Sequence, residues 1–125
     1  MKTIPIAEVR SNLQSVMFFV SEGRNRVVLV DGDEERGALI SLDDLAMLEA
    51  LSRNGESAIP TVTPEEFRTN IPEVVRRDER VILCDENVDI IAVVPKRDVE
   101  ALESLDGKID LEAAKQNLEQ QMDES

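Results

Sequence analysis

The spacing of apolar residues near the N-terminus changes from a period of two to a period between three and four. Residues 2–6 (KTIPI) alternate apolar and polar side chains, which is typical of a short strand. Residues 6–23 then place apolar side chains three or four positions apart, as on one face of an amphipathic helix. Gly23 is a plausible helix stop. This stretch therefore predicts a strand followed by one continuous helix.

The next apolar positions form two short runs separated by turn residues. The runs, residues 26–30 and 38–42, predict two strands, the first of them well buried. The polar stretch between them begins with Asp31-Gly32, a strong hairpin signal. Leucines then recur with helical spacing after Ser41, a good N-cap residue, which predicts a second helix. The order of elements is strand, helix, strand, strand, helix.

The same pattern occurs a second time in the chain. A shift of 54 residues aligns positions 26–51 with 80–105 without a gap, and nine of those 26 pairs are identical. A shift of 58 residues aligns the preceding stretch, so that Glu8, Arg10 and Asn12 match Glu66, Arg68 and Asn70. Because the matches keep their order across all five elements, we interpret them as an internal repeat rather than as coincidence.

The second half predicts the same elements with sharper boundary signals. Residues 63–66 (TPEE) form a capping box with Pro64 at the first helical position. Pro72 interrupts that helix, so we expect a bend or a new helical turn there. The remaining elements are expected as strands at 80–84 and 90–94 and a helix at 97–105. One such unit of roughly 50 residues buries little surface, so two units are expected to pack together about an approximate two-fold axis.

Composition restricts the classes of function. The chain of 125 residues has no Trp, Tyr or His and a net charge of −13, so its core must be aliphatic and any contact with DNA must be local. A single cysteine, Cys84, excludes an internal disulfide, and we expect it to be a buried thiol. No apolar run reaches the ~20 residues of a membrane span and no signal peptide is evident, so we expect a soluble cytoplasmic protein. Without a phosphate-binding loop or a cluster with metal-ligand spacing, we expect neither an enzyme nor a cofactor or metal site.

The opening MKTIPIAEVRSNL, the strand RVVLV and the segment GALISLDDLAMLEAL, in this order of elements, resemble the Phd/YefM (prevent-host-death) antitoxin family. The resemblance covers residues 1–52 well and residues 60–105 less well. Family members normally carry one unit and dimerise, whereas this chain carries two. The resemblance implies an α+β fold with Phd/YefM-like repeats at 1–54 and 60–105, packed as an intrachain pseudo-dimer that may not need homodimerisation. A linker at 53–60 and a C-terminal helical tail at 106–125 complete the expected organisation.

The resemblance implies an antitoxin that neutralises a protein toxin and represses its own operon. In the family an arginine near the start of the first helix enters the DNA groove, and Arg10 and Arg68 occupy that position here. A guanidinium suits the O6/N7 edge of guanine or a phosphate. The neighbouring polar residues are candidates for further contacts to DNA: Ser11, Asn12, Thr69 and Asn70. The alternative is that both arginines are solvated surface residues near a helix start.

Acidic hairpins weigh against strong DNA binding. The expected hairpins carry the turns DGDEERG and DENVD, whose carboxylates repel phosphates. Compensating positive charge is expected from other basic residues in the two repeats: Lys2, Arg24, Arg26, Arg76, Arg77 and Arg80. DNA binding is therefore expected to be weak and salt-sensitive.

The tail offers a second candidate binding surface. Asp110 can cap a helix, after which apolar residues share one face: Leu111, Ala114, Leu118 and Met122. Together with its carboxylates, this face suits a basic RNase-like surface, and the resemblance implies a toxin such as an RNase or a Fic-type enzyme. The alternatives are a helix that closes the domain or a solvated tail.

Two other functions remain open at this point. The chain could be a DNA-independent, acidic protein-interaction module on the same fold. It could also be a stand-alone transcriptional repressor without a toxin.

Overall fold

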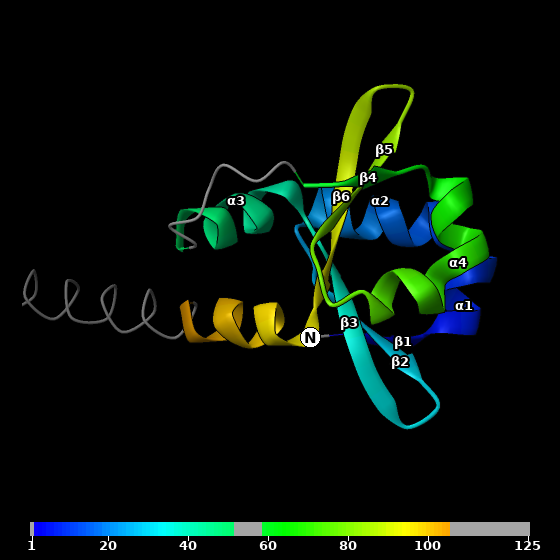
Figure 1. The fold of residues 1–125 in the computed structure, drawn as a ribbon, viewed down its shortest axis with the longest axis horizontal. Helices are drawn as coiled ribbons and strands as arrows, with labels where there is room; N and C mark the ends of the chain where they lie inside the picture. Colours follow the sequence, from blue (N-terminus) through cyan, green and yellow to red (C-terminus); the bar gives the residue numbers. More distant parts are fainter. Residues whose placement is uncertain (1, 52–58, 106–125) are drawn as a thin grey trace, which may run out of the picture.

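A six-stranded sheet forms the middle layer of the protein, and helices cover both of its faces (Figure 1). The structure is a computed structural model that describes residues 2–51 and 59–105. The strands are β1 (Lys2–Pro5), β2 (Val27–Asp31), β3 (Glu34–Ile40), β4 (Thr61–Val62), β5 (Val81–Asp85) and β6 (Val88–Pro95). The described residues form five helices: α1 (Ile6–Ser11), α2 (Leu13–Gly23), α3 (Leu42–Leu51), α4 (Pro64–Arg76) and a last one over residues 96–105. The prediction of a mixed α+β fold is confirmed.

From either edge inward, the sheet presents equivalent strands of the two halves in the same order, β1-β2-β3 from one edge and β4-β5-β6 from the other. The full strand order is β1-β2-β3-β6-β5-β4, with β1 parallel to β2, β4 parallel to β5, and the other neighbours antiparallel. At the centre β3 pairs with β6, and Leu39 lies opposite Val93. The 54-residue shift makes these two residues equivalent positions of the two halves. The two halves of the chain therefore meet in one continuous sheet around that pair of residues.

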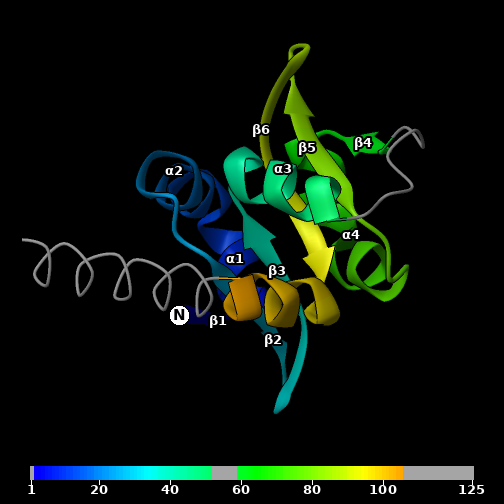
Figure 2. The same ribbon diagram turned by 90° about the vertical axis from the view of Figure 1, so that its left-hand side faces the viewer.

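Side chains alternate between the two faces of the sheet, so the protein has two hydrophobic cores. On one face, Leu29, Leu39 and Val93 pack with the apolar sides of α1, α2 and α4. On the other face, Ala38, Ile40 and Val94 pack with α3 and the helix at 96–105. Figure 2 shows the second pair of helices lying in front of the sheet. This alternation is the period-two pattern of strands that are buried on both faces.

The first helical segment of each half is bent at an asparagine. Asn12 (φ −127°, ψ 33°) separates α1 from α2, and Asn70 (φ −123°, ψ 30°) interrupts α4 with nearly the same backbone angles. The prediction of one continuous helix over residues 6–23 is therefore wrong. The bend expected at Pro72 is present but lies two residues earlier, and the first half makes it without proline. Proline alone therefore does not cause the bend.

The turn and cap signals hold in the structure. The Thr63 hydroxyl accepts a hydrogen bond from the Glu66 amide at 3.1 Å, and the Ser41 hydroxyl accepts one from the Asp44 amide at 3.2 Å. Gly32 has the positive φ (65°) that its hairpin turn requires. In the other half Glu86 takes the equivalent place with φ 50°, and Asn87 after it also has a positive φ of 66°, so that turn has two left-handed residues where the first has one.

One buried ion pair in each half ties the second helix to the sheet. Arg26 binds Asp44 through two hydrogen bonds of 2.9 and 3.1 Å, and Arg80 binds Asp98 with the same two distances. Arg80 also donates to Glu49 of the other half at 2.9 Å. The hydrogen bond to Asp98 raises the pKa of Arg80 more than its burial lowers it. The expectation that Arg26 and Arg80 supply charge to DNA is therefore wrong, because both side chains are engaged with carboxylates.

An exposed ion pair occurs in both halves with its charges exchanged. Arg24 binds Asp43 at 3.0 Å in the first half. In the second half, Asp78 is equivalent to Arg24 and Arg97 is equivalent to Asp43, and these two residues also form an ion pair. Arg24 and Asp78 also share a left-handed backbone, with φ of 51° and 53°. The same contact is thus kept at corresponding places with opposite polarity.

Candidate nucleic-acid interface

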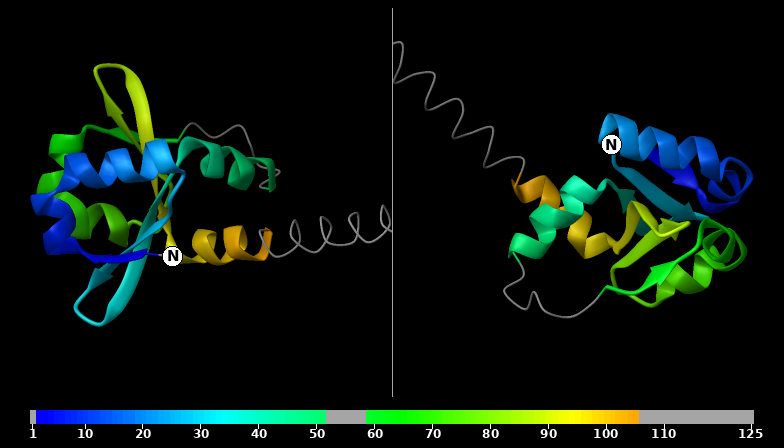
Figure 3. Two further views of the ribbon diagram at one scale, coloured as in Figure 1. Left: turned by 180° about the vertical axis from the view of Figure 1, so that it is seen from behind. Right: turned by 90° about the horizontal axis from the view of Figure 1, so that it is seen from above.

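Helices α1 and α4 bring the two predicted arginines together. They lie at the end of the molecule opposite α3 and the helix at 96–105 (Figure 3). The Arg10 Nε donates a hydrogen bond of 3.1 Å to the backbone carbonyl of Arg68. The Arg68 Nη1 lies 3.4 Å from the Glu65 Oε1 within its own helix. Because both side chains are exposed, they form one small basic site, named here the arginine pair.

The residue before each arginine explains this placement. Val9 and Phe67 are equivalent positions, and both are fully buried in the core between the helices and the sheet. Successive side chains of a helix point about 100° apart, so anchoring these residues turns Arg10 and Arg68 outward. The hydrophobic pattern of each half therefore fixes the direction of its arginine.

The other four predicted contact residues lie beside the arginine pair. Ser11, Asn12, Thr69 and Asn70 are all exposed. The Ser11 and Thr69 hydroxyls donate to the carbonyls four residues earlier, at 3.1 and 3.0 Å. Each hydroxyl has one proton, so in this arrangement these two side chains offer an acceptor rather than a donor. A contact from either hydroxyl to a phosphate would require its rotation.

Carboxylates limit how much positive charge this region presents. Glu8, Glu65 and Glu66 are exposed in the first turns of α1 and α4, where the helix dipole favours them. Of the eleven lysines and arginines in the described residues, seven contact a carboxylate: Arg24, Arg26, Arg36, Arg68, Arg80, Lys96 and Arg97. The four without such a contact are Lys2, Arg10, Arg76 and Arg77, and Lys2 instead lies over the Phe19 ring at 5.1 Å. Within residues 2–51 and 59–105, positive charge for an anionic partner therefore comes mainly from the arginine pair and from Arg76 and Arg77.

The hairpins carry the acidic turns that the sequence predicts. The β2–β3 and β5–β6 hairpins project beyond the helices at opposite ends of the sheet (Figure 1). Residues 31–36 and 85–89 at these ends are all exposed. A phosphate backbone that contacts the arginine pair is repelled wherever it also approaches these ends.

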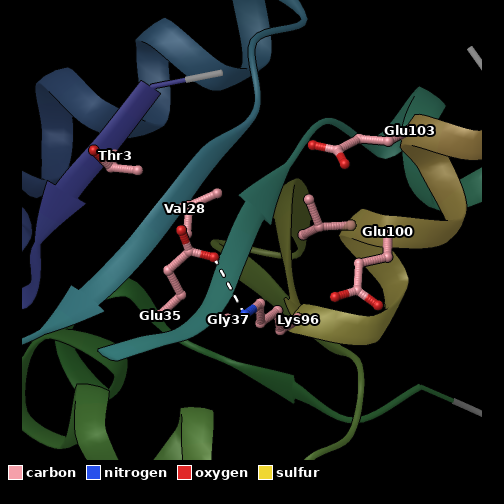
Figure 4. A pocket seen from close by; sticks show the side chains of 8 residues that line it. Thr3, Val28, Glu35, Gly37, Lys96, Glu100 and Glu103 are labelled. Atoms are coloured by element: carbon pink, nitrogen blue, oxygen red, sulfur yellow. Dashed lines mark ion pairs between the residues drawn. The ribbon is translucent and has the colours of Figure 1, made fainter. Parts of the chain in front are cut away.

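Hollows open on the surface of the part of the chain that the structure describes. One, of about 560 Å³, lies between α2 and the start of α4 and is lined by Gln14, Thr63, Glu65, Arg68 and Asp85 among others. Another, of about 230 Å³, lies between the helix at 96–105 and β1–β3 (Figure 4). There Glu100 and Glu103 face the sheet, and Lys96 lies 3.5 Å from Glu35. The first hollow adjoins the arginine pair, while the second is acidic and unsuited to an anion.

The described residues give few other chemical groups to consider. Residues 2–51 and 59–105 contain no group of three or more acidic or cysteine side chains placed to hold a metal ion. In the same ranges, no helix combines the length and apolarity of a membrane span. Cys84 is half-buried rather than fully buried as expected, and desolvation together with Asp89 raises the pKa of its thiol.

The sequence interpretation missed the buried pairs that hold Arg26 and Arg80. A signal was present, because an arginine and an aspartate recur 18 residues apart in both halves. The predicted partner-binding residues of the tail lie outside the described residues: Leu111, Ala114, Leu118 and Met122. No protein-family model, curated protein or solved structure matches this chain.

Proposed function

We propose that this chain is an antitoxin-like regulator with two Phd/YefM-type units, which binds operator DNA through the arginine pair and neutralises a protein toxin through its tail. The single observation that supports this proposal best is the contact between Arg10 and Arg68. Two residues 58 positions apart meet on one exposed surface, at equivalent places in two similar halves. A guanidinium pair in this position can enter a groove or bind phosphates on either side of it.

The sheet supports the idea of an intrachain pseudo-dimer. Its strand order is palindromic, and the central pair, Leu39 and Val93, joins equivalent positions. In homodimeric DNA-binding proteins the two-fold axis presents the same side chains to two half-sites. Two fused units achieve the same presentation within one chain.

A second candidate function is an acidic, DNA-independent interaction module. It is favoured by the exposed carboxylates at both hairpin ends and by the acidic composition, with 27 acidic and 14 basic residues. A basic protein surface, such as one that normally holds RNA, would bind this charge distribution.

The test is a titration of a DNA fragment from upstream of the gene, followed by fluorescence anisotropy. The double variant Arg10→Ala/Arg68→Ala should abolish binding, whereas Arg36→Ala, an exposed arginine on the β2–β3 hairpin, should bind like the wild type. Equal affinity of the double variant and the control would refute the DNA-binding role. Circular dichroism of each variant shows whether it is folded.

The toxin-binding role is tested separately. The protein encoded next to this gene is co-expressed with the full chain or with a chain that ends at Leu105. Neutralisation and co-purification should require residues 106–125. If the shortened, folded chain still neutralises the toxin, the tail is not the docking segment.

A further inference from the structure

The two halves differ at the pair of positions that follows the bend in the first helical segment. Phe18 and Phe19 of α2 correspond, under the 58-residue shift, to Arg76 and Arg77 at the end of α4. The Phe18 side chain is 67% exposed, and both arginines are exposed as well. One flank of the molecule, defined by Phe18 and Phe19, is therefore aromatic, and the other, defined by Arg76 and Arg77, is basic.

Among the described residues, the basic flank is the largest source of unneutralised positive charge outside the arginine pair. Arg76 and Arg77 contact no carboxylate, unlike seven of the eleven cations in the described residues. They follow Arg68 by eight and nine residues, beyond the bend at Asn70, so they lie on the second segment of α4 and at its C-cap. Asp78 is engaged with Arg97, which leaves Glu73 and Glu79 as the nearest opposing carboxylates in the sequence.

The aromatic flank has no arginines that could bind a phosphate as Arg76 and Arg77 could. Around Phe18, the exposed residues of α2 are polar or acidic, with Glu22 one turn farther along. This flank does carry one cation, because the Lys2 ammonium lies over the Phe19 ring at 5.1 Å. A duplex centred on the arginine pair would thus meet two guanidinium groups on one side and a single ammonium group on the other.

We propose that the arginine contacts to the phosphate backbone are one-sided, with Arg76 and Arg77 binding it beyond one half-site while Phe18 and Phe19 occupy the equivalent positions beyond the other. This inference rests on the proposed DNA-binding function. A homodimer must present identical flanks, and so it favours a symmetric operator. Fusing the two units removes that requirement, and each flank can then differ, as the residues at 18–19 and 76–77 do.

The test combines salt-dependent affinity with hydroxyl-radical footprinting on the upstream DNA fragment. The wild type should protect a footprint that extends farther on one side of its centre. Arg76→Ala/Arg77→Ala should remove the extension and lower the slope of log K against log salt by about 2, since each phosphate contact contributes about 0.9. Glu73→Gln should increase affinity by removing an opposing charge.

A gain-of-function variant makes the test sharper. Phe18→Arg/Phe19→Arg should extend protection on the short side and raise the salt slope by about 2, because it places the same residues on the second flank. A symmetric wild-type footprint, or an unchanged slope in Arg76→Ala/Arg77→Ala while Arg10→Ala/Arg68→Ala abolishes binding, would overturn the one-sided contact alone. Absence of binding by the wild type would overturn this inference together with the DNA-binding function.

Discussion

Removing the carboxylate of Asp44 should destabilise the protein much more than removing its neighbour Asp43. Asp44 holds Arg26 through two hydrogen bonds, and their side chains are only 11% and 14% exposed. Asp44→Ala leaves the Arg26 guanidinium in a half-buried position without this partner. Breaking a buried pair costs about 3–5 kcal/mol, and the residual exposure favours the lower end, about 3 kcal/mol.

Asp43 is a matched control because it lies in the same first turn of α3. It binds Arg24 at 3.0 Å, but these side chains are 66% and 74% exposed. Exposed pairs contribute about 0–1 kcal/mol, so Asp43→Ala should cost no more than that. Both substitutions remove one carboxylate from the same helix start, so the loss of the favourable helix-dipole interaction is similar and largely cancels in the comparison.

The assay is urea unfolding followed by far-UV circular dichroism, since the chain has no Trp or Tyr to report by fluorescence. The expected difference of at least 2 kcal/mol between the variants corresponds to about 6–12 °C in Tm for a chain of this size. Asp98→Ala should be destabilising in the same way, with Glu49 retaining part of the interaction with Arg80. If Asp44→Ala and Asp43→Ala unfold at the same urea concentration, the buried pair does not anchor α3 to the sheet.

Two further predictions concern the features that recur in both halves. Exchanging the exposed pair, as Arg24→Asp/Asp43→Arg, should leave the free energy of unfolding within about 0.5 kcal/mol of wild type, because the other half already carries this polarity; a loss above 2 kcal/mol in urea unfolding would contradict it. Thr63→Ala should lower the free energy of unfolding by about 1 kcal/mol through loss of the N-cap hydrogen bond from the Glu66 amide, measured by the same titration. Ser41→Ala removes the corresponding cap at the start of α3 and should lower the free energy of unfolding by a similar amount.

Local elements were predictable because their signals lie within a few residues. Alternating and continuous apolar runs identified the strands, Asp31-Gly32 identified a hairpin, and Thr63-Pro64 identified a helix start. The bend at Asn12 was not predictable from the apolar spacing, which continues past it without interruption. Both α1 and α2 pack against the sheet despite the bend between them. The apolar periodicity alone therefore predicts one helix where the structure has two.

The sequence by itself determined that the chain repeats one pattern of elements, that each half must bury an apolar face, and that an arginine recurs at an equivalent place in each half. Only the tertiary structure decided that β3 and β6 join the halves in one sheet, that Arg26 and Arg80 bind aspartates, and that Arg10 contacts Arg68. The physical reason is distance along the chain. Apolar periodicity specifies which face of an element is buried, but a charged side chain finds its partner only after packing has brought residues 18 to 58 positions apart into contact.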